Sequence, residues 1–307
     1  MRRWALILLA VAAAFATAPR VEAQTKSPPS AAERQKEIES AFEAGAAAGT
    51  RGPATVQLLA QGRIELPDGY IFIPKSEGAR IMSAIGNRTG TAFVGLILST
   101  ASDAAWMTTL NFISSGFVKD DDAKNWNAAE LLQSLKDGTE EGNADRVQRG
   151  FQPIEVSGWI EPPGYDGTTQ RLIWSALVRR KEGATEANSS VNYNTYALGR
   201  EGYFSLNLIT GQRTVDSDKR HAHRLLGALA FNEGKRYADF NSSTDRVAEY
   251  GLAALIAGAA AKKLGLFALA FAFVAKFAKV IAIGAFGVIA VAGKLFSRRK
   301  KDDGEQT

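Results

Sequence analysis

Hydrophobic and polar residues alternate through the middle of the chain with the two-residue period of β-strands. These runs are rich in Val, Ile, Leu, Tyr and Trp, residues that favour a pleated, half-buried surface. We expect strands over residues 54–75 (several short ones), 94–100, 106–118, 154–161, 172–179, 191–198 and 203–209. The last two are joined by Gly-Arg-Glu-Gly at 199–202, which predicts a hairpin with a glycine available for positive φ at either corner.

Apolar residues spaced three and four apart predict helices between the strands. We expect helices over residues 31–49, 76–85, 126–147 and 218–230. Ser76 is expected to cap the second helix, and the Asp run at 120–122 to lie at the N-terminus of the third. The order of elements predicts one α+β domain with a mixed, largely antiparallel sheet and flanking helices.

The stretch GWIEPPGYDGTTQRLIWS, residues 158–175, places two prolines and two glycines between two tryptophans. Proline cannot donate to a strand ladder, so we expect the strand to end at Pro162 and a structured loop to follow. Of the residues in this loop, Tyr165 is the one whose presence the formation of a turn explains least. It is therefore the best candidate for contact with a partner. The candidate binding residues are Glu161, Tyr165 and Asp166 on this loop, with Arg200 in the 199–202 turn as a possible anion contact.

The N-terminal sequence has the pattern of an export signal. A basic start, an apolar run at 4–17 and Val-Glu-Ala at 21–23 predict a signal peptide cleaved before Gln24.

Near the C-terminus, three apolar blocks cover residues 250–261, 264–275 and 280–293. Lys279 and Lys294 can reach the two membrane interfaces from a span at 280–296, and the basic cluster at 297–301 is expected to stay in the cytoplasm. Lys276 is the third lysine expected near the interface.

Together these patterns predict a single-pass membrane protein whose main domain lies outside the inner membrane. The expected segments are a signal peptide (1–23), an N-terminal linker and helix (24–50), an exported α+β domain (51–243), a membrane-proximal Ala/Gly-rich helix (244–279), a C-terminal transmembrane helix (280–296) and a basic cytoplasmic tail (297–307). Residues 250–275 could span the membrane, lie on it or pack on the domain. The 241–245 segment is expected to cap the helix that starts this region, whose glycines recur every seven residues on one helical face.

The sequence pI of about 9.3 comes from the two ends. Residues 24–261 carry 25 basic and 28 acidic groups, so the central region is mildly acidic. A nucleic-acid interface needs a basic face on the domain itself, and the charge distribution argues against one.

The types of residue in the chain limit which catalytic and metal sites it can form. The chain has no cysteine, which excludes thiol nucleophiles and thiolate zinc sites. His221 and His223 lie two apart on a predicted helix and so point to different faces, as surface residues rather than joint metal ligands. A carboxylate pair for acid–base catalysis could come from Glu155, Glu161, Asp166 and Asp239. The spacing of these residues in the sequence favours no particular pair. We therefore predict no catalytic residue, no metal and no cofactor.

Three strings occur in a specific order: GWIEPPGYDGTTQRLIWS, VNYNTYALGREGYFSLNLI and GKRYADFNSSTDRVAEYGLAALIAG. Together with the Lys-rich apolar C-terminus, they resemble a bacterial family of membrane-anchored proteins, domain of unknown function 2167. The resemblance covers most of residues 50–300. It implies a membrane anchor in the cell envelope of a Gram-negative-type bacterium, which would make the location the bacterial inner membrane with a periplasmic main domain. It brings no activity, cofactor or catalytic residue.

Three hypotheses of function follow. The first is a non-enzymatic binding or interaction module, in contact with the bilayer and with an envelope protein partner or a helix–helix oligomer. The second is a membrane-tethered hydrolase that uses carboxylates on an envelope polymer or peptide, for which we expect two carboxylates in a cleft beside residues 161–166. The third is a transport or channel accessory in which Lys276 and Lys279 face a polar path.

Overall fold

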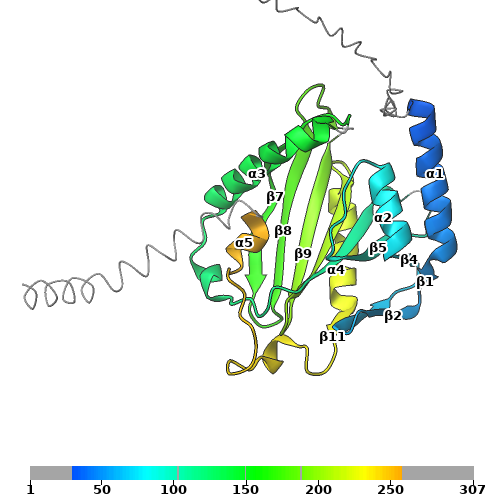
Figure 1. Ribbon diagram of the computed structural model, residues 1–307. Helices are drawn as coiled ribbons and strands as arrows, with labels where there is room; N and C mark the ends of the chain where they lie inside the picture. The colour runs from blue at the N-terminus through cyan, green and yellow to red at the C-terminus, as the bar shows by residue number, and fades with distance from the viewer. Residues whose placement is uncertain (1–29, 102–103, 149, 187–188, 258–307) are drawn as a thin grey trace, which may run out of the picture.

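The computed structural model describes residues 30–101, 104–148, 150–186 and 189–257 (Figure 1). Their main feature is an eight-stranded sheet in which every paired strand is antiparallel. In spatial order its strands are β1 (Thr50–Arg51), β4 (Tyr70–Pro74), β5 (Phe93–Ser99), β6 (Met107–Ile113), β10 (Tyr203–Gly211), β9 (Ser190–Leu198), β8 (Arg171–Arg180) and β7 (Ile154–Asp166). A smaller antiparallel sheet has the order β11 (Leu229–Phe231), β3 (Gly62–Leu66) and β2 (Ala54–Leu58).

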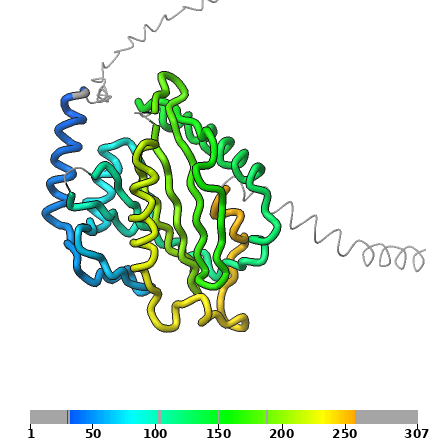
Figure 2. The backbone as a smooth tube through the Cα atoms, turned by 180° about the vertical axis from the view of Figure 1, so that it is seen from behind, coloured from blue at the N-terminus to red at the C-terminus, as the bar shows by residue number. Residues whose placement is uncertain are grey.

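Helices flank the large sheet, which confirms the predicted α+β class. The helices are α1 (Ala31–Ala48), α2 (Lys75–Ala84), α3 (Ala128–Gln148), α4 (Val215–Ala228) and α5 (Ala253–Ala257), with short 3₁₀ turns η1 (Asp121–Lys124) and η3 (Tyr237–Asp239). Helices α1 and α2 pack on β4 and β5, and α3 packs on β7. Figure 2 shows α4 along the opposite face, over β9 and β10.

The alternation of side chains along each strand places separate apolar clusters on the two faces of the sheet, one under α4, one under α3 and α5, and one under α1 and α2. Tyr193 and Phe204 face α4 and pack in a cluster with its Leu225. Trp174 and Tyr196 point the other way and pack with Leu131 of α3 and residues of α5. The sheet is therefore buried on both faces, which explains why β8, β9 and β10 hold so many large apolar residues.

Most predicted elements of the central region are confirmed, and the largest difference is in β7. This strand does not end at the prolines but continues to Asp166. β7 is the edge strand of the sheet, so one side of its backbone has no ladder partner in the described residues. The pairing with β8 shifts register between Glu161 and Gly164, and this bulge contains Pro162 and Pro163. Prolines are tolerated at edges and bulges because no ladder hydrogen bond is lost there.

The helix caps also differ from the predictions. Asn127 caps α3, because its side-chain oxygen accepts from the Ala129 backbone N–H at 2.9 Å. Asp122 accepts from the backbone N–H groups of Leu252 and Ala253, at 3.0 Å each, and so caps the start of α5. The 241–245 segment does not cap that helix. No side chain caps α2, whose N-cap position is Pro74 rather than Ser76.

The C-terminal part of the fold is described only as far as α5. Leu252, Leu255 and Ile256 are buried against the α3-side core, so this segment packs on the domain. Among the described residues, no helix is both long and apolar enough to cross a membrane. The span expected at 280–296 and the expected signal peptide lie outside them.

Candidate functional site: a pocket beside Tyr165

A pocket of about 530 Å³ lies where the turn end of the β7–β8 hairpin meets the segment before α3. The two sides come from segments about 45 residues apart in the chain. Its lining residues are Asp120, Asp121, Ala123, Lys124, Trp126, Pro163, Tyr165 and Gly167. The pocket thus combines two aromatic rings with two carboxylates and one ammonium group.

Tyr165 is one of the two aromatic residues that line this pocket. Its hydroxyl donates a hydrogen bond to Asp120 Oδ2 at 2.8 Å. Burial, followed by the hydrogen bond and charge of Asp120, raises the pKa of Tyr165 well above its ordinary value. The phenol therefore stays protonated at neutral pH, so Tyr165 offers an aromatic face and a hydrogen bond rather than a general base.

The neighbouring residues hold the pocket wall in place. Trp159 donates its indole N–H to the Ala128 carbonyl at 3.0 Å, which fixes β7 to the start of α3. Asp166 accepts from the Thr168 backbone N–H at 2.8 Å and from the Thr169 hydroxyl at 2.7 Å. These bonds, the Thr169 hydroxyl first, lower the pKa of Asp166. Asp166, a candidate binding residue, therefore fixes the hairpin turn instead.

Glu161, another candidate binding residue, is not in this pocket. Its Oε2 accepts a hydrogen bond from the Tyr193 hydroxyl at 2.7 Å, and that hydroxyl also lies 2.9 Å from His223 Nε2. Burial and the bond to Glu161 raise the pKa of Tyr193. The three side chains form a polar chain on the α4 side of the sheet.

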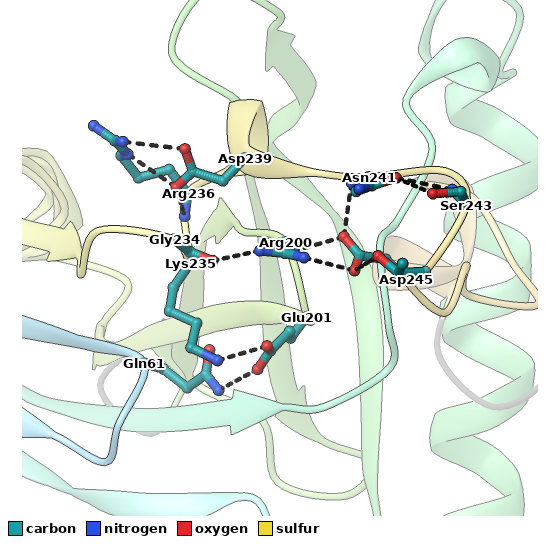
Figure 3. Close-up of polar contacts among 11 residues, drawn as sticks. Gln61, Arg200, Glu201, Gly234, Lys235, Arg236, Asp239, Asn241, Ser243 and Asp245 are labelled. Carbon is teal, nitrogen blue, oxygen red and sulfur yellow. Dashed lines mark hydrogen bonds and ion pairs between the residues drawn. The ribbon is translucent and has the colours of Figure 1, made fainter.

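Arg200 is not an open anion contact either (Figure 3). Its guanidinium donates to both oxygens of Asp245, at 2.6 and 2.8 Å, and to the Gly234 carbonyl at 3.2 Å. Asp245 also accepts from the Asn241 backbone N–H at 2.7 Å. The arginine thus joins the β9–β10 turn to the 241–245 segment, and a carboxylate of the same chain fills the place expected for an anion.

This ion pair predicts a pH dependence of stability. The Arg200 guanidinium, and then the Asn241 N–H, hold the pKa of Asp245 well below its ordinary value. Its contribution to stability is therefore complete above about pH 4, near the unfolded pKa, and is lost as the pH falls through the lower folded pKa. We expect the unfolding free energy of the wild-type chain to fall more steeply below pH 4 than that of Asp245→Asn. Urea unfolding from pH 7 to pH 3 measures this, and parallel acid limbs would contradict it.

The other carboxylates considered for catalysis have separate partners. Glu155 pairs with Arg179 at 2.6 Å and Asp239 with Arg236 at 3.0 Å. None of the four predicted candidates is paired with another. Asp120 and Asp121 share the pocket described above, and the sequence offered them only as a helix terminus. Within the described residues no group of three or more His, Asp or Glu is arranged to hold a metal ion.

Both histidines contact tyrosine hydroxyls. His223 is exposed, as the sequence predicted, whereas His221 is half-buried. His221 Nδ1 lies 2.7 Å from the Tyr70 hydroxyl, and its ring stacks on Trp106 with a centroid distance of 4.8 Å. Burial, and then the charge of Arg220, lower the pKa of His221. The two histidines contact different tyrosines, His221 Tyr70 and His223 Tyr193.

Of the four candidate residues, only Tyr165 contributes directly to the pocket, with Asp166 beside it in the turn. Asp120 and Trp126 are the functional candidates that sequence reasoning missed. An Asp run followed by a tryptophan was the available signal, but nothing local connects it to residue 165. The membrane-interface lysines, Lys276, Lys279 and Lys294, lie outside the described residues.

A family model matches residues 50–287, more than half of the chain. The chain belongs to the DUF2167 family of proteins of unknown function. None of the curated proteins matches this DUF2167 chain. Among solved structures, cyanobacterial PsbP (CyanoP) from Synechocystis sp. PCC 6803 is similar over 60% of this chain and 91% of its own, at 8% identity and a TM-score of 0.36. A similarity at this level supports no conclusion about function.

Proposed function

We propose that this DUF2167 chain is a cell-envelope protein whose described domain is a binding module, and that its partner binds in the Tyr165 pocket. The observation that carries this proposal is the pocket itself, where Trp126 and a protonated Tyr165 lie beside Asp120 and Asp121. Half-buried aromatic residues in a concave site are typical anchor points for a partner.

The charges of the pocket indicate what the partner presents. Two carboxylates face one ammonium group, so the lining is net negative. A Lys or Arg side chain of an envelope protein fits this arrangement, because it can pair with the carboxylates and lie over an aromatic ring. The Asp120–Tyr165 bond orders the ring before binding, which lowers the entropy lost when the partner binds.

The proposed location rests on the two ends of the sequence. The apolar run at 4–17 with its cleavage site supports export, and the apolar segment at 280–296 with the basic cluster behind it supports a single anchor. In this proposal the domain lies in the periplasm and the tail at 297–307 in the cytoplasm.

The second candidate function is a hydrolase acting on an envelope polymer or peptide. The specific observation in its favour is that Asp120 and Asp121 share a pocket beside the β7–β8 hairpin. In an enzyme, Asp121→Asn would abolish turnover of envelope polymer by the purified full chain but leave its binding intact. In a binding module there is no turnover to lose, and the same variant weakens binding.

The test of the first proposal compares capture of an envelope partner by purified full-length variants. We expect Tyr165→Ala and Asp120→Asn each to weaken capture about tenfold, the effect of losing one central anchor or one charge pair. Asn at position 120 can still accept the Tyr165 hydrogen bond, so that variant isolates the charge. Asp216→Asn, on the exposed start of α4, is the matched control and should bind as the wild type does. Equal capture by all variants would contradict the proposal.

A further inference from the structure

A second pocket, of about 450 Å³, lies at the opposite end of the β7–β8 hairpin. Its wall is assembled from α1, the C-terminal end of α3, the segment that follows α3 and the ends of β8 and β9. The binding site proposed above does not include this region.

Four arginines line the pocket: Arg34, Arg146, Arg179 and Arg180. No acidic residue is among its lining residues. Glu155 lies just outside and pairs with Arg179 at 2.6 Å, so the charge of Arg179 is shared. Arg180 is exposed, and within the part of the chain that the structure describes its side chain has no hydrogen bond or ion pair. Arg146 Nε donates to the Gln152 carbonyl at 3.3 Å. The pocket lining is therefore net positive, although residues 24–261 as a whole are net acidic.

The scaffold under these arginines is fixed by specific contacts. Asn143, only 5% exposed, binds both backbone groups of Ile154: its oxygen accepts from the N–H and its amide donates to the carbonyl, each at 2.9 Å. The ring of Phe151 packs against Gly86, where an added Cβ would lie 2.3 Å from a ring atom. Phe151 is thus held by the turn after α2 and Ile154 by α3, which fixes the pocket wall beside Arg146.

We infer that this pocket binds a phosphate-bearing anion. Guanidinium groups bind phosphate with paired N–H···O bonds, and arginines from separate elements can contact more than one oxygen of one phosphate group. Phe151 and Ile154 add apolar surface for an organic part of the ligand. The volume suits a phosphate monoester with a small organic group. Such a group occurs on soluble phosphorylated metabolites and on phospholipid headgroups.

The experiment titrates the purified full-length chain with glycerol 3-phosphate and with short-chain dihexanoyl phosphatidic acid at constant ionic strength. These probes carry the same phosphate monoester, without and with acyl chains. We expect Arg180→Ala to weaken binding of the preferred probe about tenfold, the effect of losing one charge-assisted contact. Arg180→Lys keeps the charge but loses the paired geometry, so an intermediate affinity is expected.

Arg63→Ala is the control, because this half-buried arginine lies on β3 in the small sheet, away from the pocket, and pairs with Glu65. It should bind both probes as the wild type does. Similar affinity for both probes assigns a soluble phosphate monoester, and tighter binding of the lipid assigns a phospholipid headgroup. Failure of both probes to bind, or affinities that are equal in the wild type, Arg180→Ala and Arg63→Ala, would overturn the inference. Thermal unfolding of each variant confirms that Arg180→Ala remains folded.

Discussion

Gly202→Ala is expected to lower the free energy of unfolding by about 3 kcal/mol, the upper end of what backbone strain alone costs. Gly202 has φ of +152°, and a Cβ added there would lie 2.0 Å from the Ile113 carbonyl oxygen. That oxygen belongs to the backbone of β6, so it cannot rotate away as a side chain can. Gly199 at the other corner does not have positive φ, so only one of the two glycines fills the role that the sequence suggested.

Urea unfolding of the purified full chain measures this effect. The matched control is Gly138→Ala on the exposed side of α3, where an added Cβ meets nothing within 4 Å. That change should stabilise the helix by roughly 0.5–1 kcal/mol because glycine is a poor helix former. A Gly202→Ala chain as stable as the wild type would show that the β9–β10 turn adopts another conformation.

Phe204→Ala is expected to cost about 3–5 kcal/mol, the range for a fully buried phenylalanine. Its side chain is 0% exposed, and its ring lies 5.0 Å from that of Phe112 and 5.1 Å from that of Phe231, centroid to centroid. It therefore joins β10 and β6 of the large sheet to β11 of the small one.

The same unfolding measurement separates this loss from a general effect of truncation. Val147→Ala removes an apolar side chain that is 56% exposed, so it should change stability by less than about 0.5 kcal/mol. Phe204→Leu fills most of the cavity and should cost less than Phe204→Ala. Equal losses for Phe204→Ala and Val147→Ala would contradict the position of Phe204 in the core.

Local patterns were sufficient to predict the β9–β10 hairpin. Both strands alternate, and a four-residue turn with two glycines lies between them. The end of β7 could not be predicted in the same way. Whether a proline interrupts a strand depends on whether its missing N–H would have had a partner, and this depends on the edge position of β7 in the sheet.

The candidate site could likewise be predicted only in part from the sequence. Tyr165 could be singled out because turn chemistry did not account for it. Its partner Asp120 is 45 residues away, and only the packing of the segment before α3 against the hairpin brings the two together. The same holds for Arg200 and Asp245, and for the arginines at the other end of the hairpin. The sequence shows which side chains can form hydrogen bonds and ion pairs, but the tertiary structure determines which residues they bind.

The most direct test of the proposed function is photocrosslinking in intact cells from within the Tyr165 pocket. Benzoylphenylalanine in place of Lys124 lies in the lining and leaves Tyr165 and Asp120 unchanged. We expect a discrete adduct with one envelope protein from this position, which Tyr165→Ala in the same chain abolishes. The same group in place of Lys219, on α4 over the opposite face of the sheet, should give no such adduct. No adduct from position 124, or an adduct that Tyr165→Ala leaves unchanged, would contradict the proposal that this pocket binds the partner.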